Sequence, residues 1–108
     1  MQKFKFMYDE EADSLTVYRD DRKNNASIKF GEIIVDLDKN YNISAIEILN
    51  PDLLYDIPKN KLGKIREASV QIQHRGQLFW IFIMLKFKGI KEIEKLQVPL
   101  QLEQKIAV

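Results

Sequence analysis

The chain of 108 residues contains no cysteine and a single histidine, His74. Without cysteine, thiolate catalysis, disulfides and cysteine-ligated zinc are excluded, and one histidine excludes a multi-histidine metal site within one chain. The four glycines are scattered and form no phosphate-binding loop. His74 has no serine or acid in a context that indicates a catalytic triad, and we interpret it as a surface or half-buried residue. These absences favour a protein that is not an enzyme and uses no cofactor.

Long apolar runs are also absent. The longest, residues 78–85, falls far short of the roughly 20 apolar residues that a membrane-spanning helix needs. The start of the chain, MQKFKFM, alternates polar and apolar residues and lacks the apolar region of a signal peptide. We therefore expect a cytoplasmic protein that does not enter a membrane.

Charge is nearly balanced overall but unevenly distributed. The net charge of +1 gives no reason to expect nucleic acid or a membrane as partner. Residues 1–54 carry 7 basic and 11 acidic side chains, whereas residues 55–108 carry 10 and 5. This difference is explained either by chance segregation of solvated charges or by head-to-tail contact between two copies.

The apolar pattern is that of antiparallel strands separated by polar turns. Strand-like segments cover residues 3–8, 15–18, 26–30, 33–37, 43–48, 68–75, 78–85 and 96–102. Asn50 and Pro51 indicate the start of one short helix within residues 51–62, while residues 90–96 fit either a helix or a strand. We predict a mainly β fold, α+β at the margin, with six to eight antiparallel strands in two packed or strongly bent sheets.

The length favours one domain over residues 1–108. It divides into β-hairpins over residues 1–50, a connector over 51–63 and a β-meander over 64–103. Residues 78–85 are apolar on both faces, which predicts a central, mostly buried strand with Trp80 or its neighbours Phe79 and Ile81 among the least exposed residues. Pro99 cannot donate to a strand ladder, so residues 96–102 are predicted to form an edge strand, followed by a frayed tail at 104–108.

Several acidic residues suggest chemistry that their context argues against. Asp9, Glu11, Asp13 and Asp20 share part of the spacing of a calcium-binding loop, but Ser14 replaces its glycine and a strand follows, so we expect no metal. We interpret this segment as a hairpin tip whose aspartates accept hydrogen bonds from local N–H groups.

Asp36 and Glu47 lie on facing strands of the hairpin over residues 33–49. If Asp38 pairs with Asn42, the resulting register directs these two carboxylates to opposite faces. We therefore predict that they do not form a catalytic acid–base pair.

The densest basic stretch contains Lys59, Lys61, Lys64 and Arg66. It fits a solvated connector, and its alternative interpretation is a patch that binds anions or nucleic acid. These four are the candidate binding residues of the sequence.

Two motifs, YDEEAD at residues 8–13 and the pair IVD at 34–36 and IEIL at 46–49, resemble those of a family of small prokaryotic proteins known only as a domain of unknown function. The resemblance covers about residues 3–52. The family has glycine where this chain has Tyr41, so we expect Asn40 or Asn42 to adopt the left-handed turn conformation instead.

The resemblance implies a β-rich fold without an established activity. Its motif residues of unknown role are Tyr8, Asp9, Asp13, Asp36 and Glu47. Members of such families sometimes resemble toxin–antitoxin partners. We predict a non-enzymatic interaction module that forms a homodimer through its second half or binds a protein partner. The alternative is a small-molecule or nucleic-acid binder that uses residues 59–66.

Overall fold

The computed structural model of the protein describes residues 2–21, 23–75 and 78–100. It contains eight strands: β1 (Gln2–Asp9), β2 (Ser14–Tyr18), β3 (Ala26–Phe30), β4 (Ile33–Leu37), β5 (Ile43–Leu49), β6 (Ile65–Arg75), β7 (Leu78–Phe87) and β8 (Ile90–Leu100). Two short helices, α1 (Pro51–Leu54) and α2 (Lys59–Leu62), connect β5 to β6. The predicted mainly β fold is confirmed, with two short helices where the sequence indicated one.

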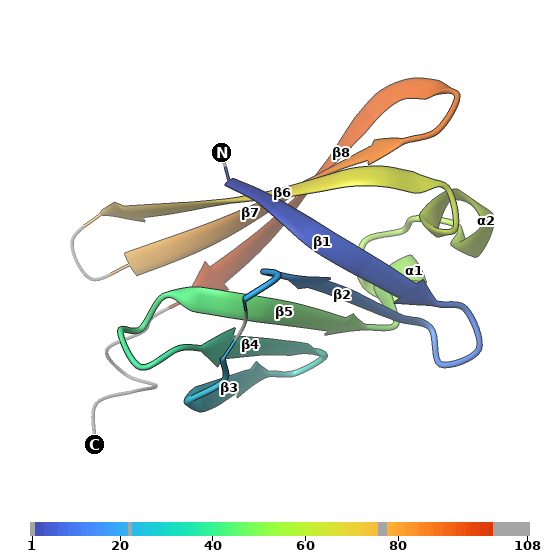
Figure 1. The fold of residues 1–108 in the computed structure, drawn as a ribbon. Helices are drawn as coiled ribbons and strands as arrows, with labels where there is room; N and C mark the ends of the chain where they lie inside the picture. The colour runs from blue at the N-terminus through green and yellow to red at the C-terminus, as the bar shows by residue number, and fades with distance from the viewer. Residues whose placement is uncertain (1, 22, 76–77, 101–108) are drawn as a thin grey trace.

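All eight strands form one antiparallel sheet in the order β3-β4-β5-β2-β1-β6-β7-β8. The sheet curls strongly, so that β6, β7 and β8 lie above β5, β4 and β3 (Figure 1). The β1–β2 hairpin joins the two parts, because β2 pairs with β5 and β1 pairs with β6. The predicted strong bend is therefore present within a single sheet.

The hydrophobic core fills the concave side of the curled sheet. On β7 the side chains of Ile81, Ile83 and Leu85 are almost completely buried. The connector adds Ile57 and Leu62, each 1% exposed, which pack into the same core cluster. The helices lie at one end of the molecule (Figure 1), so the connector closes that end of the core.

The alternate side chains of β7 face away from this core. Trp80, Phe82 and Met84 are only half-buried, whereas Ile81 is 1% exposed. The prediction that Trp80 or one of its neighbours is among the least exposed residues is therefore confirmed at Ile81 and not at Trp80. The cause is the curl of the sheet, which leaves these positions on its outer side.

Strand β8 resolves the alternative that the sequence left open for residues 90–96. The segment is a strand that pairs with β7 over Ile90 to Leu100 and ends the strand order. The predicted edge strand is thus confirmed as far as Leu100. The predicted frayed tail at residues 104–108 lies outside the described part of the chain.

Candidate functional site

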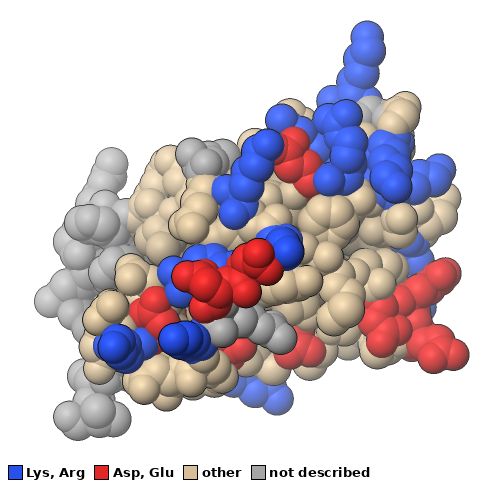
Figure 2. Space-filling model, in the orientation of Figure 1, with Lys and Arg blue, Asp and Glu red and all other residues tan. Residues whose placement is uncertain are grey.

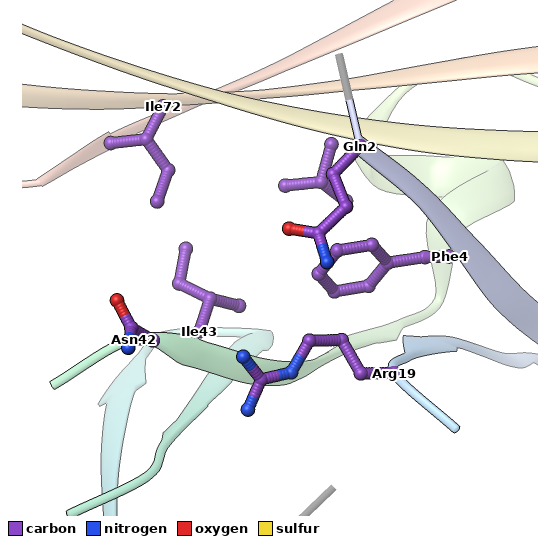
Figure 3. A pocket seen from close by; sticks show the side chains of 7 residues that line it. Gln2, Phe4, Arg19, Asn42, Ile43 and Ile72 are labelled. Atoms are coloured by element: carbon purple, nitrogen blue, oxygen red, sulfur yellow. The ribbon is translucent and has the colours of Figure 1, made fainter. Parts of the chain in front are cut away.

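A small cavity lies between the two parts of the curled sheet, opposite the end that the helices close. Figure 3 shows side chains from both parts pointing into it, and its volume is about 190 Å³. Its lining consists of Gln2, Phe4, Arg19, Asn42, Ile43, Val70 and Ile72. Apolar side chains therefore form most of the wall, and Arg19 supplies its charge.

Arg19 is held by hydrogen bonds at both ends. Its backbone N–H donates to the carbonyl of Ser44 over 2.9 Å, and its Nη2 donates to Oδ2 of Asp38, also over 2.9 Å. The Nε atom is buried without a hydrogen-bond partner among the described residues, 3.6 Å from Oδ1 of Asp21. Two carboxylates therefore compensate this guanidinium, and the cavity does not carry an uncompensated positive charge.

Asp38 also organises the turn between β4 and β5. Its Oδ1 accepts the backbone N–H groups of Asn40 and Asn42 over 2.8 and 3.0 Å. The bond from Arg19, followed by these backbone bonds, lowers the pKa of Asp38 below its usual range. The prediction that Asn40 or Asn42 adopts the left-handed conformation is wrong. Tyr41 itself has φ +62°, because the Asp38 carboxylate fixes the residues on both sides of Tyr41.

A second polar cluster joins the β1–β2 turn to α1. Tyr8 donates its hydroxyl to Oδ1 of Asp13 over 2.8 Å, and Asp13 is 6% exposed. Asp13 has φ +49°, and its carbonyl accepts the N–H of Asn50 over 2.8 Å. These contacts fix the hairpin tip against the start of the connector.

Asp13 also interacts with Asp52 on α1, and the two carboxyls shift each other's pKa in opposite directions. Burial raises the pKa of Asp13 and the bond to Asp52 raises it further, whereas the bond to Asp13 lowers the pKa of Asp52. Burial, and then the bond to Asp13, also raises the pKa of Tyr8. These shifts arise in a cluster whose contacts tie together parts of the protein itself.

The other motif carboxylates are bound locally. Asp9 accepts the N–H of Ala12 over 3.1 Å, as predicted for a hairpin tip. Asp36 accepts the hydroxyl of Ser27 over 2.7 Å. Glu47 accepts the hydroxyl of Ser14 over 3.3 Å. Each carboxylate therefore has a structural partner of its own.

The predicted placement of Asp36 and Glu47 on opposite faces is wrong. A β-bulge between Asp36 and Leu37 shifts the register, so that Asp36 lies opposite Ala45 and Glu47 opposite Ile34. Both carboxylates therefore share the face opposite the buried side chains of β4. They are diagonal neighbours bound to different serines, which gives no support to an acid–base pair.

The predicted basic residues do not act as one group. Lys59, Lys64 and Arg66 are exposed. In contrast, Lys61 is half-buried, with its Nζ 2.8 Å from Oε1 of Glu94 and 4.9 Å above the ring of Phe87. The N–H of Lys88 donates to the carbonyl of Lys64 over 2.8 Å, which brings the β7–β8 turn beside this stretch.

Charges of each sign gather on different parts of the surface. Figure 2 shows Lys and Arg over the end that carries the β7–β8 turn and α2, and Asp and Glu over the β1–β2 turn below it. Within the described ranges, no group of three or more histidine, aspartate or glutamate side chains is arranged to hold a metal ion. No helix of the described chain has the length and apolar character to cross a membrane.

The described residues thus define a small antiparallel β protein in which no assembled catalytic centre is recognisable. Residues 5–50 match the family model described as "Protein of unknown function (DUF2283)". The predicted family resemblance is confirmed. All five motif residues, Tyr8, Asp9, Asp13, Asp36 and Glu47, fall within the matched segment.

Two curated proteins are similar to parts of this chain. An uncharacterised protein of Methanocaldococcus jannaschii is 37% identical over 62 residues, which are 57% of this chain and 53% of the relative. A Methanosarcina mazei protein named "Putative hypoxanthine phosphoribosyltransferase" is 33% identical over 74 residues, 67% of this chain and 60% of the relative. The chain thus spans somewhat over half of the length of these relatives. No solved structure matches it.

Proposed function

We propose that the protein is a cytoplasmic, non-enzymatic interaction module that forms a homodimer through β8. The observation that supports this proposal is the position of β8 at the end of the strand order, where it pairs only with β7 among the residues that the structure describes. Such an edge presents unpaired N–H and C=O groups to another chain. A two-fold symmetric pair of β8 strands is the simplest way to satisfy them.

The opposite edge strand, β3, is less suited to this role. It has 5 residues, whereas β8 has 11, so β8 offers about twice the length for backbone pairing. Ile93 on β8 is also 49% exposed, and a partner strand would cover part of that apolar surface. The same edge would serve a different protein partner, including one of the toxin–antitoxin kind.

The name of the Methanosarcina relative suggests another activity, which we do not extend to this chain. A phosphoribosyltransferase has to bind a pyrophosphate group, for which proteins commonly use a glycine-rich loop at a helix N-terminus. The four glycines of this chain are scattered, and α1 and α2 have four residues each.

Light scattering at micromolar concentration tests the homodimer. We expect a dimer mass for the wild type and a monomer mass for Ile93→Lys, because a lysine at the edge opposes strand pairing. The matched control is Met7→Lys on the central strand β1, where Met7 is 59% exposed. This control adds the same charge and should remain a dimer. A monomer mass of the wild type at both low and high salt would refute the proposal.

A further inference from the structure

The outer side of β6, β7 and β8 carries a row of large apolar side chains flanked by polar ones. Trp80, Phe82 and Met84 point to this side and are half-buried. Their neighbours across the ladder on β6 are Gln73, Gln71 and Ser69, of which both glutamines are exposed. We call Trp80, Phe82 and Met84 the outer row.

Lysines from three strands lie toward the Met84 end of the outer row. They are Lys3 and Lys5 on β1, Lys86 on β7 and Lys95 on β8. The ammonium of Lys95 lies 4.4 Å from the ring centroid of Phe82. The acids beside them are Glu67, which is 2.9 Å from Lys3 and 3.5 Å from Lys86, and Asp20, which is 2.8 Å from Lys5. Among the side chains that the structure describes here, these four cations outnumber the two acids.

We propose that this face binds single-stranded nucleic acid, with bases stacking on Trp80 and on Phe82, whose ring is uncovered when Lys95 turns from it to contact a phosphate beside Lys86. Half-exposed aromatic rings on a sheet with cations beside them provide both contacts that single strands need. The exposed amides of Gln71 and Gln73 add hydrogen-bond donors and acceptors for base edges.

The geometry favours a single strand over a duplex. Alternate side chains on one face of a strand are about 6.7 Å apart, roughly twice the 3.4 Å rise per nucleotide in a duplex. Successive bases therefore reach Trp80 and Phe82 only if the nucleic acid is extended and unstacked. Bases within a duplex do not present their faces for such stacking.

The charge distribution also argues against a second copy as occupant of this face. Packing two such faces together would bring their lysines close to one another, with only Glu67 and Asp20 to compensate, and like charges in contact disfavour association. A polyanion meets no such repulsion. This binding does not depend on the homodimer, because pairing through the edge of β8 leaves the outer row open.

Trp80 is the only tryptophan of the chain, so its fluorescence reports directly on this face. Titration of the full chain with oligothymidylate at low salt should quench the emission, and anisotropy of the labelled oligonucleotide should rise in parallel. We expect Phe82→Ala to weaken binding about five- to hundred-fold, the range found when a stacking residue is removed. Thermal unfolding of this variant verifies that it is folded.

A double variant, Lys86→Gln with Lys95→Gln, tests the phosphate contacts without removing apolar core. Each lost contact should reduce the slope of log affinity against log salt by about 0.7. The matched control is Lys29→Gln, an exposed lysine on β3 at the far edge of the sheet, which should leave affinity and slope unchanged.

Three results would overturn the proposal. One is the absence of quenching and of an anisotropy change at low salt. Another is equal quenching by polyglutamate, which would indicate an acidic protein partner instead. The third is binding that is unchanged by the substitutions at Phe82, Lys86 and Lys95 but is lost with Lys64→Gln and Arg66→Gln. Such a result would place the ligand on the connector. Light scattering of the same samples reports the homodimer separately.

Discussion

The two faces of β7 carry side chains of similar hydrophobicity in very different surroundings. Ile81, Ile83 and Leu85 on the inner face are at most 1% exposed, whereas Trp80 and Phe82 on the outer face are half-buried. The apolar run predicted correctly that this strand has neighbours on both sides, but β7 lies beside the edge strand β8 and not at the centre of the sheet. It did not predict the exposure of the strand's aromatic side. A single curled sheet covers its concave side alone, and the residues left outside become available for binding.

The largest expected loss of stability is at Ile83, on the inner face of β7. Ile83→Ala should lower the free energy of unfolding by about 2–5 kcal/mol, because it leaves a cavity in a closely packed core. Urea denaturation measures this change, and Met84→Ala on the outer face is the neighbouring control with a smaller expected loss. If the two variants lost equal stability, the two faces would not differ in packing.

The inner side also contains a polar contact whose loss should lower the free energy of unfolding. Tyr8→Phe removes the hydroxyl that donates to the buried Asp13 and should cost about 1–2 kcal/mol, since a buried acceptor loses a partner. The measurement is again the urea midpoint and slope. A neutral result would show that the Asp13 carboxylate does not need this hydroxyl as a partner.

A smaller loss is expected on the outer face at Phe82. Phe82→Ala should reduce stability by about 1 kcal/mol because the side chain is only half removed from water, compared with about 3–5 kcal/mol for a phenylalanine in a core. Unfolding should be measured at several protein concentrations. A core-like loss would mean that another surface covers this face in solution.

The smallest expected effect concerns the ion pairs of the outer face. Lys3, and then Lys86, lowers the pKa of Glu67, so the folded state favours the charged carboxylate. The stability from this source is present above the ordinary glutamate pKa of about 4.3 and is lost as pH falls through the lower folded value. The stability difference between wild type and Glu67→Gln should therefore shrink as pH falls. A difference that does not vary with pH would contradict this assignment.

Strand existence was predictable from local pattern, whereas register was not. The hairpin that contains β4 and β5 follows from its β-branched residues and its polar turn. Its bulge lies between Asp36 and Leu37, next to a turn in which the Asp38 carboxylate accepts the N–H groups of Asn40 and Asn42 and Tyr41 has positive φ. One shifted residue then moved Asp36 to the same face as Glu47.

The cavity residues were beyond prediction for a related reason. Arg19 meets Asp38 only because β2 lies beside β5 in the sheet, and nothing in the local sequence specifies that pairing. The sole feature of the sequence that could have indicated the cavity was an arginine at the end of a strand-like segment. Similarly, Lys86 and Lys95 joined the lysines of β1 only through the strand order.

The position of the β1–β2 hairpin has a consequence for the rate of folding. The groups β3-β4-β5 and β6-β7-β8 each consist of strands adjacent in the chain, whereas the ladder of β1 pairs Phe4 with Ala68 and that of β2 pairs Leu15 with Ile48. Pairings between distant residues form slowly because their loop-closure entropy is lost first. Until the hairpin is in place, β5 and β6 each present an open edge, and such edges promote aggregation. Refolding yield should consequently depend more on the hairpin than on either group of three strands.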